Sequence, residues 1–538
     1  MKFGNAHLAL LWKRSGLAGH LATLEAFLAK HGLWALLVFA AIYYALYFNA
    51  HLTLTGEAGS NVLIAQRINE GWRPIKDMFI GYNLMWFYPL AWIFEFTGPH
   101  LLASRIYFMV LSGVTGLLGF ALVRRATGSG ILAATAGTLM ILMPGAMYRN
   151  NVAFVATLAS FALVYGYVIP HRSRSMQILW MGFAGAAMSL CFLIRIEPSL
   201  LASVIWAGLA LLYPIGCRGV FLSRLGISLS GTILGLCAFA AVHAPFVHHA
   251  YKRGFGPEFI AQYSQFVGLL RWELIREIEK IRHAVEPEKN KFQQSSPAGG
   301  PAANSSAAIA PPETRKPQTA ESSDGRRPRP PFADSIQKGR ISFFPLSIYF
   351  PILASVVLVI AGGLFFLRGA VAGLPTPRQS GLAILATTGC ALTLFPQFFF
   401  FRPDSVHLAE FMVPFYPALA CGAAAAIGLV RLGSWRAFFG TLVLGVAGLQ
   451  AIVAFNSLFG REGSGSIRIA RGKTVIFQAP GGIRFRVNPE DLVDWERLRD
   501  VLNASTRDGD CLVTYPYVPL LNVMDEWRST WQGLLVQR

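Results

Sequence analysis

The chain has 538 residues; 54% of them are hydrophobic and 14% are charged, against roughly 45–50% apolar and about 25% charged in soluble domains. This composition excludes an ordinary soluble globular protein. Lysine and arginine total 47 against 28 acidic residues, a net charge of +19, but the basic residues stand mostly in short runs between apolar segments. Such runs determine the orientation of membrane helices. The composition therefore predicts a polytopic membrane protein and no nucleic-acid partner.

The first apolar segment runs from about Leu33 to Leu52 and is long enough to span a bilayer. It has no small-residue cleavage pattern after it, so we expect a retained first helix and no cleaved signal peptide. Lys13, Arg14 and Lys30 precede it. The positive-inside rule therefore places the N-terminus in the cytoplasm.

The next apolar stretch, about 82–96, is short and aromatic and contains a proline and an acidic residue. If it spanned, the helix after it would deliver Arg124 and Arg125 to the outer face, so we expect it to lie in the interface as a juxtamembrane helix. With this choice the basic clusters all fall inside. About eleven spans of ~20 residues result, at 33–52, 100–123, 128–146, 152–170, 177–194, 198–215, 225–246, 345–367, 380–400, 407–430 and 437–456.

The extramembrane segments complete the predicted architecture, which is mainly α with an outer C-terminal domain. A helical pattern at about 259–283 leads into an insert, 284–340, that is too poor in apolar residues to fold and is expected to be disordered. The tail alternates at 474–478 and 483–487, turns helical at 489–502 and is strand-like at 511–515. We therefore divide the chain into a transmembrane domain, 1–456, with its first outer loop at 53–99, and a small α/β domain, 457–538.

Nearly all acidic residues that adjoin the predicted spans fall on the outer side. The positive-inside rule accounts for basic inner loops but not for carboxylates that gather outside. Carboxylates that meet on one face suggest a functional site there. These residues are Glu57, Asp77, Glu95, Glu197, Asp404 and Glu410.

The first outer loop carries an ordered set of short motifs: Glu57 after the first helix, Gly71 after an amphipathic segment, the step Pro74–Asp77, the aromatic end Phe94–Gly98, and Arg105 at the start of the next span. This order resembles the first extracytoplasmic loop of GT-C-class membrane glycosyltransferases, the protein O-mannosyltransferase and aminoarabinose transferase group (glycosyltransferase family 39-like). Two departures stand out. Glutamate stands where aspartate is usual, and a frequent proline pair is missing.

Two later segments resemble the same group. "FLIRIEPSLLA" resembles an Arg-x-acid step and contains Arg195 and Glu197, and "FFRPDSVHLAEFMVP" resembles an Arg-x-Asp-x-x-His-Leu step that contains Arg402, Asp404 and His407. The resemblance covers about residues 30–530. It implies a bundle of GT-C type that works at the outer face of a bacterial cytoplasmic (inner) membrane, in the synthesis of a cell-envelope glycan.

The implied reaction moves one sugar from a polyprenyl-phosphate donor to a lipid, polysaccharide or protein acceptor, in a single displacement with inversion. Removing a proton from the acceptor requires a carboxylate within hydrogen-bond reach, and Glu57 and Asp77 are the candidates. Guanidinium groups stabilise the leaving phosphate by bidentate contacts. The candidates for binding the donor are Arg402, Arg195, His407, Lys76, Asp404 and Glu197.

Structural alternatives remain for these residues. Glu57 has the alternative of capping a helix over 58–70, and Asp77 that of a turn residue or of an ion pair with Lys76 or Arg73. Arg195 and Glu197 have the alternative of pairing only with each other. The six cysteines have no paired spacing and predict neither a disulfide nor a metal site. A divalent metal, Mg²⁺ or Mn²⁺, stays unassigned, because no ligand cluster such as Asp-x-Asp occurs.

Two groups of aromatic and histidine residues are interpreted as structural. Tyr82, Trp86, Phe87 and Tyr88 are expected to form an interfacial aromatic belt and not a sugar platform. The adjacent pair His248 and His249 at the end of the seventh span lacks ligand geometry. We expect both histidines to be solvated loop residues.

Two other function classes stay open. A transporter or flippase of a lipid-linked saccharide usually carries ionisable residues near the bilayer midplane and often two related halves; the predicted spans hold almost no such charges, and no repeat is visible. A relative that binds glycolipid without catalysis is the third interpretation, prompted by the departures in the first outer loop. The sequence favours the enzyme.

Overall fold

The computed structural model describes residues 17–47, 57–78, 80–99, 101–142, 150–215, 220–264, 343–396 and 405–429, and in the tail 475–478, 484–487, 489–505, 511–512 and 528–529. All structural statements concern these residues. The predicted insert, the predicted span 437–456, Arg402 and Asp404 lie outside them. The chain divides into two compact units, Met1–Ile260 with Ser347–Arg538, and Ala261–Leu346.

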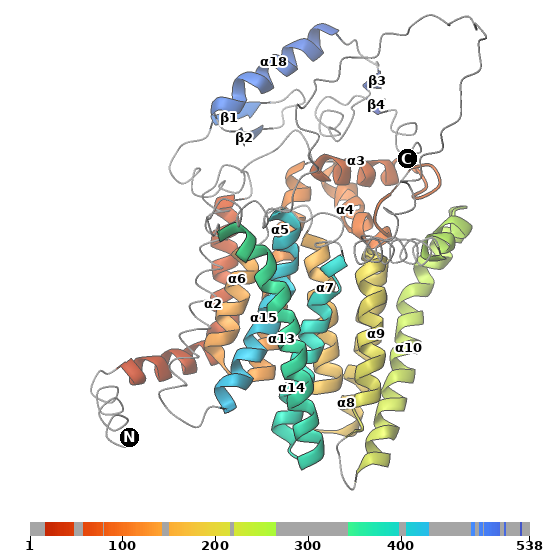
Figure 1. Cartoon of the computed structure of the whole chain (residues 1–538). Helices are drawn as coiled ribbons and strands as arrows, with labels where there is room; N and C mark the ends of the chain where they lie inside the picture. The colour runs from red at the N-terminus through yellow and green to blue at the C-terminus, as the bar shows by residue number, and fades with distance from the viewer. Residues whose placement is uncertain are drawn as a thin grey trace, which may run out of the picture. The chain divides into compact units, whose positions relative to one another are not determined.

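Helices make up most of the described residues of the first unit (Figure 1). Every predicted span up to 407–430 overlaps a described helix, although the first helix begins well before Leu33. The helices are α2 (Leu17–Tyr47), α3 (Glu57–Asn69), α4 (Leu84–Thr97), α5 (Leu101–Thr127), α6 (Gly130–Leu142), α7 (Asn150–Leu163) with a π-helical end (Val164–Val168), α8 (Arg174–Ile194), α9 (Ile196–Leu212), α10 (Phe221–Lys252), α13 (Phe343–Ala372), α14 (Pro375–Leu392) and α15 (Ser405–Leu429).

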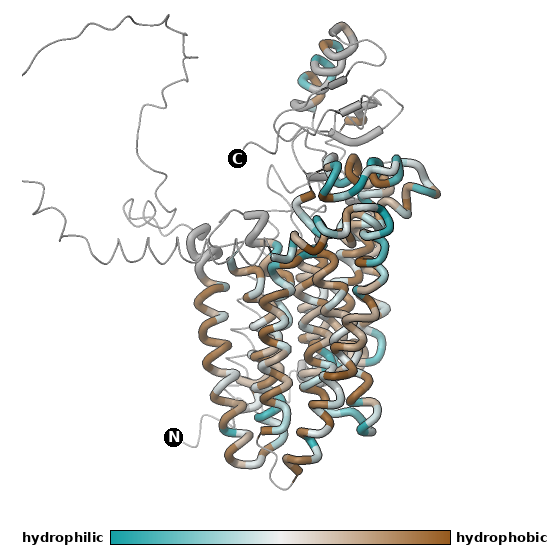
Figure 2. The backbone as a smooth tube through the Cα atoms, turned by 90° about the vertical axis from the view of Figure 1, so that its right-hand side faces the viewer, coloured by the Kyte–Doolittle hydropathy of each residue, from teal (hydrophilic) through white to brown (hydrophobic). Residues whose placement is uncertain are grey.

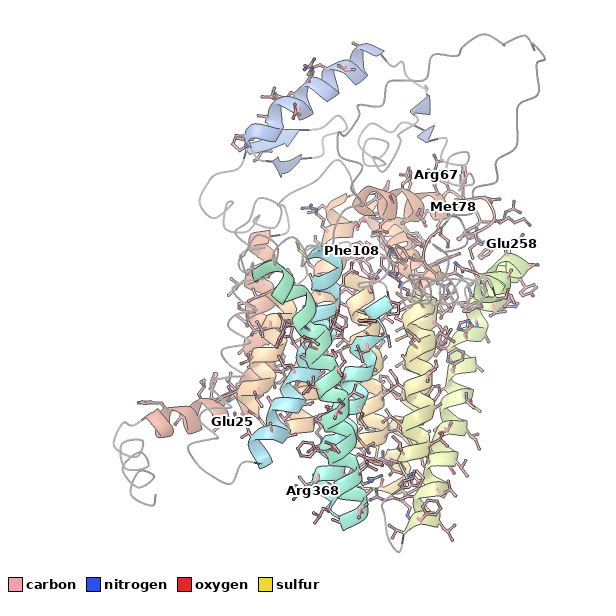
Figure 3. All side chains as sticks on the ribbon, viewed as in Figure 1. Glu25, Arg67, Met78, Phe108, Glu258 and Arg368 are labelled. Atoms are coloured by element: carbon pink, nitrogen blue, oxygen red, sulfur yellow. The ribbon has the colours of Figure 1, made fainter. Side chains whose placement is uncertain are left out.

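The chain is a multi-pass membrane protein: 7 described helices are long and apolar enough to cross a membrane, and α6 and α9 are shorter apolar helices. Figure 2 shows that apolar residues dominate the bundle and that hydrophilic residues gather around the first outer loop. Arg67, Met78 and Glu258 lie at the end of the bundle that carries α3 and α4, whereas Glu25 and Arg368 lie at the opposite end (Figure 3). We name these the outer and inner ends, after the predicted orientation.

Glycines bring α8 and α10 into close contact. A Cβ added at Gly185 would collide with the backbone of Gly235, and a Cβ at Gly231 would collide with the side chain of Met181. Membrane helices associate through such small residues because apolar burial offers little gain between helices in lipid. Close packing at these glycines therefore fixes the position of α8 against α10, and Arg195 follows the outer end of α8.

The first outer loop forms α3 and the juxtamembrane helix α4, as the sequence predicts. Gly71 and Gly98 follow these helices with φ of 92° and 76°, a left-handed backbone that glycine adopts without steric cost. The amide of Gly98 donates to the carbonyl of Phe94 at 2.9 Å, closing α4. The two glycines of the loop motif therefore end two helices.

The expected aromatic belt is wrong for three of the four residues assigned to it. Trp86 and Phe87 are each 1% exposed and Tyr88 is 7% exposed, because α3 and α8 pack against α4. The large apolar side chains that α4 exposes are instead Trp92 and Phe96, one helical turn apart. These two residues are positioned to contact lipid.

Charged side chains fasten helix termini at the inner end. Glu25 of α2 accepts hydrogen bonds from the first amides of α6, including that of Ile131 at 3.0 Å. The guanidinium of Arg378, which is 5% exposed, donates to carbonyls at the end of α9 and just after it, including that of Ile215 at 2.9 Å. Both contacts satisfy backbone groups that a helix leaves open at its ends.

The described tail has the predicted elements. Strands β1 (Val475–Gln478) and β2 (Arg484–Val487) pair antiparallel, with Val475 opposite Val487, and helix α18 (Pro489–Ser505) follows. Strands β3 (Cys511–Leu512) and β4 (Arg528–Ser529) pair in parallel. The alternation at 474–478 and 483–487 thus marks a hairpin.

Candidate functional site

The site is centred on Arg195, where the chain passes from α8 to α9. Arg195 has extended backbone angles, φ −154° and ψ 125°, so it interrupts an otherwise continuous helical run. Its amide still donates to the carbonyl of Cys191 at 2.8 Å, and its carbonyl accepts the hydroxyl of Ser199 at 2.6 Å. The junction therefore holds this arginine in one backbone conformation.

The first outer loop is attached to the end of α8 through Asn83. The backbone amide of Asn83 donates to the carbonyl of Ile194 at 3.2 Å, and its side-chain amide donates to the carbonyl of Phe192 at 2.9 Å. Its side-chain oxygen accepts the amide of Leu84 and so caps α4. Asn83 thus attaches the start of α4 to the end of α8, next to Arg195.

The Arg195 side chain is nearly inaccessible; the residue is 8% exposed. Its Nε donates to Oε2 of Glu197 at 3.0 Å, and its guanidinium lies 5.2 Å from the centre of the Tyr82 ring. Glu410 of α15, also 8% exposed, interacts with it electrostatically. Nη1 of Arg195 is buried and has no hydrogen-bond partner in the described part of the chain. A buried guanidinium N–H without a partner is costly, and it is available to a ligand.

The aromatic residue above the guanidinium is itself held firmly. The ring of Tyr82 stacks on Trp86 with centroids 3.7 Å apart and an angle of 14° between the planes. The indole Nε1 of Trp86 donates to the side-chain oxygen of Asn61 on α3 at 3.0 Å. A ring face that meets a guanidinium adds a cation–π attraction. Helices α3, α4 and α8 therefore converge on one buried positive group.

Asp77 has the ion pair that the sequence offers as its structural alternative, with Arg73. Its carboxylate accepts the Arg73 backbone amide at 2.8 Å and two guanidinium N–H groups at 2.7 Å. These hydrogen bonds hold the pKa of the Asp77 carboxyl below its usual value and raise the pKa of Arg73. Ile75 within this turn has a φ of 71°, which is strained for a β-branched residue.

Lys76 connects the same turn to the segment after α10. Its ammonium donates to the carbonyl of Gly254 at 2.8 Å and lies 3.5 Å from a carboxylate oxygen of Glu258. The described structure therefore uses Lys76 to hold two outer segments together. Its predicted role in binding the donor stays a prediction.

The remaining predicted residues are placed as follows. Arg195 and Glu197 are brought together, and both lie at the outer end. Glu57 is the first residue of α3 and His407 lies in the first turn of α15, but their side chains, like all of Arg402 and Asp404, are outside the described residues. Their assignment stays a prediction.

Residues that the sequence analysis did not select also contribute. Tyr82 faces the guanidinium, and Asn83 joins the loop to α8; the only sequence signal for Asn83 is its position before an aromatic helix, where asparagine is a favoured cap. His249 was expected to be solvated, but it lies 3.0 Å from the Tyr88 hydroxyl. Burial raises the pKa of Tyr88 to about 12. His248 is exposed, as expected, but both histidines lie in the last turns of α10 and not in a loop.

No three His, Cys, Asp or Glu residues among those described come close enough together to hold a metal ion. The described part of the site therefore does not provide a ligand set for Mg²⁺ or Mn²⁺.

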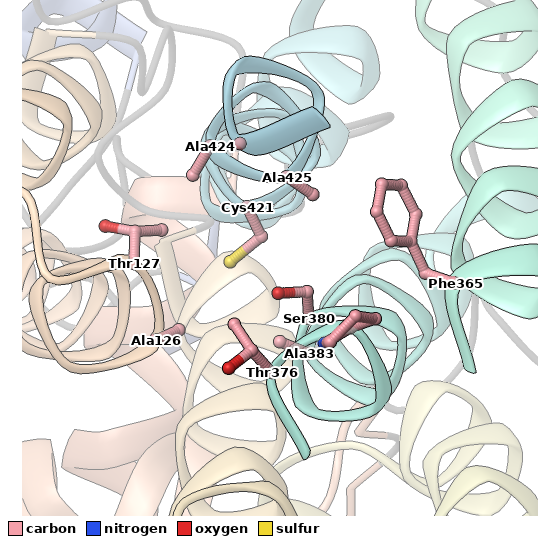
Figure 4. Close-up of a pocket in the computed structure, with 11 residues that line it drawn as sticks. Ala126, Thr127, Phe365, Thr376, Ser380, Ala383, Cys421, Ala424 and Ala425 are labelled. Carbon is pink, nitrogen blue, oxygen red and sulfur yellow. The ribbon is translucent and has the colours of Figure 1, made fainter. Parts of the chain in front are cut away.

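A cavity of about 260 Å³ lies at the inner end, between α5, α13, α14 and α15. Figure 4 shows Ser380 and Cys421 extending into it. Its lining is mostly small, with Ala126, Ala383 and Gly428 among the residues. Because Thr127 at its rim is the last residue of α5, this cavity lies at the opposite end from Arg195 and is separate from the site.

No family model and no curated protein matches the chain in sequence. Solved structures do match. The aminoarabinose transferase ArnT of Cupriavidus metallidurans matches at 15% identity bound to undecaprenyl phosphate and at 17% in the apo state, each with a TM-score of 0.42 over 80% of this chain. The oligosaccharyltransferase of Archaeoglobus fulgidus matches at 13% identity and a TM-score of 0.42 over 93% of this chain. The chain spans 65% of the transferase and 64% of the oligosaccharyltransferase. Both proteins are GT-C glycosyltransferases.

Proposed function

We propose that the chain is a membrane glycosyltransferase that moves one sugar from a polyprenyl-phosphate donor to an acceptor hydroxyl or amine. The observation that supports this most is the buried guanidinium of Arg195, with its open Nη1 and two neighbouring carboxylates, at the outer end of a membrane bundle. We place the reaction at the outer face of a bacterial cytoplasmic membrane, where the donor's phosphate meets water while its lipid tail stays in the bilayer.

The polar groups around Arg195 match a phosphosugar better than a bare anion. A phosphate oxygen can accept the open N–H of the guanidinium. A bare anion would meet Glu197 and Glu410 with like charge, whereas sugar hydroxyls can donate to these carboxylates. A ligand that carries an oxyanion and hydroxyls together therefore satisfies both kinds of group. For its carrier we propose undecaprenyl phosphate, the lipid bound in one of the similar structures.

The chemistry follows as a single displacement. The acceptor oxygen or nitrogen attacks the anomeric carbon, the bond from that carbon to the phosphate oxygen breaks, and the phosphate leaves with the electron pair toward Arg195. A carboxylate takes the acceptor proton. Both oxygens of Asp77 accept hydrogen bonds from Arg73, and a lowered pKa makes its carboxylate a weaker base. We therefore assign the proton to Glu57 and a positioning role to Asp77.

The test is mass spectrometry of membrane glycolipids, polyprenyl-phosphate sugars and envelope glycans from cells that express the wild type, a deletion, Glu57→Gln or Arg195→Gln at matched levels. Both point variants should lose one sugar from one acceptor and accumulate its polyprenyl-phosphate donor. Glu95→Gln, an exposed glutamate of the same outer loop, is the matched control and should leave the glycan unchanged.

The opposite result is equally specific. If the deletion leaves an intact lipid-linked saccharide on the cytoplasmic leaflet while Glu57→Gln and Arg195→Gln behave as the wild type, the enzyme proposal is wrong. The transporter interpretation would then replace it. A glycan that is unchanged in both point variants, with lipid binding lost, would favour a non-catalytic glycolipid-binding protein.

A further inference from the structure

The first turn of α7 carries a buried amide that the structure leaves without a partner. Asn151 is 1% exposed, and neither its side-chain nitrogen nor its side-chain oxygen has a hydrogen-bond partner among the described residues. A buried polar group without partners costs free energy, and native proteins rarely leave both ends of an amide open. Packing therefore does not explain this residue.

The contact between α7 and α8 places Asn151 level with Arg195. The thiol of Cys191 on α8 donates to the carbonyl of Val155 on α7 at 3.5 Å. Asn151 precedes Val155 by four residues and Arg195 follows Cys191 by four, and the two helices run in opposite directions. One turn from this contact, about 5.4 Å along each helix, therefore brings both residues to the outer end of the same helix pair.

We propose that Asn151 is a specificity-determining residue that binds hydroxyl groups of the donor's sugar while Arg195 binds the phosphate; this inference rests on the proposed function. A phosphate oxygen only accepts hydrogen bonds, so it would satisfy the amide N–H of Asn151 and leave its oxygen bare. Neighbouring hydroxyls of a sugar both donate and accept and so satisfy both atoms. The guanidinium of Arg195 thus binds the phosphate and the amide of Asn151 binds the sugar of the same donor.

The same helix supplies a matched control. Thr157, with no measurable exposure, has a buried hydroxyl without a partner in the described ranges, but it lies more than a turn deeper in the bundle than Asn151. If an open buried polar group on α7 were enough to affect binding, Thr157 would act as Asn151 does. Replacing Asn151 with leucine removes the bare amide at similar volume, so it should preserve the fold or stabilise it.

The experiment measures dissociation constants of the full chain in lipid nanodiscs, for wild type, Asn151→Leu, Asn151→Ser and Thr157→Val. The probes are undecaprenyl phosphate and its esters with glucose, mannose and arabinose. The wild type should prefer one ester over the bare lipid. Both Asn151 variants should lose at least about tenfold in affinity for that ester, because each removes one hydrogen bond or more, with unchanged affinity for undecaprenyl phosphate. Asn151→Leu should not lower the unfolding temperature. Thr157→Val should behave as the wild type.

Several outcomes overturn the inference. If the Asn151 variants keep the preference for the ester, the amide binds only water. If they lose affinity for undecaprenyl phosphate as much as for the ester, the amide acts on the phosphate and not on the sugar. If they unfold, the amide is structural. A wild type that binds every lipid alike also overturns it, while leaving the proposed function intact. If the wild type binds none of these lipids, the proposed function fails as well, so the two failures are distinguishable.

Discussion

Replacing Arg195 with lysine tests the central element of the site. Lysine retains the positive charge beside Glu197, so the fold should lose little. It lacks the planar fork, however, and cannot direct one N–H to Glu197 and another to a ligand in a fixed geometry. We therefore expect Arg195→Lys to bind undecaprenyl phosphate much more weakly while it remains folded.

The magnitude follows from one hydrogen bond made by the open Nη1 of Arg195. A hydrogen bond to a charged group contributes about 1.5–3 kcal/mol, and a factor of ten in affinity corresponds to about 1.4 kcal/mol. Losing the contact made by Nη1 should therefore weaken binding by about 10- to 150-fold. Guanidinium–ring and ammonium–ring attractions differ by less than this at a site of this kind, so the Tyr82 contact does not dominate the result.

Arg378 provides the matched control, because it is as buried as Arg195 but lies at the inner end. Its guanidinium donates to the carbonyls of Leu212, Tyr213 and Ile215. Arg378→Lys should therefore lower the free energy of unfolding by about 1–3 kcal/mol and leave the dissociation constant unchanged. Both quantities are measured on the purified chain, by titration with the lipid and by thermal unfolding.

The reverse pattern would refute the reasoning. If Arg195→Lys binds the lipid with wild-type affinity, the open N–H is not a ligand contact. If both lysine variants weaken binding equally, the effect is one of stability and does not locate a site.

Three further predictions concern the loop and the bundle. Asp77 has a lowered pKa, so the stability that its ion pair adds is present above the ordinary aspartate pKa and is lost only as the pH falls through the lower folded value. Amide hydrogen exchange of the first outer loop, corrected for intrinsic rates, should therefore stay slow from pH 8 to pH 5. Asp77→Asn should speed this exchange at every pH in that range. Gly71→Ala should cost about 1–2 kcal/mol in thermal unfolding because its φ is 92°, whereas Gly81→Ala, which also meets open space but lacks a positive φ, should be neutral. Gly185→Ala should lower the free energy of unfolding by more than about 3 kcal/mol or prevent folding, because it overpacks the contact between α8 and α10. Gly208→Ala, whose added Cβ meets nothing, should leave the unfolding temperature unchanged. Equal effects of the two substitutions would contradict this contact.

The helices were predictable because apolar length and basic loops act locally along the chain. Treating 82–96 as too short to span followed from its length, its proline and the charge of the next loop, and the structure forms the 14-residue helix α4 over Leu84–Thr97. The start of the first helix was not predictable from hydropathy. Hydropathy marks the part of a helix that lipid requires, whereas α2 begins at Leu17, in a segment that also contains Glu25.

The burial of Trp86, Phe87 and Tyr88 was not predictable from the preference of aromatic residues for interfaces. That preference applies to side chains that face lipid, and here α3 and α8 cover the helix. The pairing of Arg195 with Glu197 was accessible because a single residue, Ile196, separates them at a helix junction. The contact of Lys76 with Glu258 was not, because only the folded bundle brings the two residues together.

Arg195 and Arg378 show why residue type and burial do not identify a ligand site. Both are buried arginines at helix ends of the same bundle, and each lies near an aromatic ring. The difference is in how their N–H groups are used. Arg378 donates to backbone carbonyls at the end of α9 and in the turn after it, so its hydrogen bonds complete the fold. Arg195 keeps a buried N–H without a partner in the described structure, and the fold gains nothing from that. A cost that folding does not explain is expected where a protein binds something else.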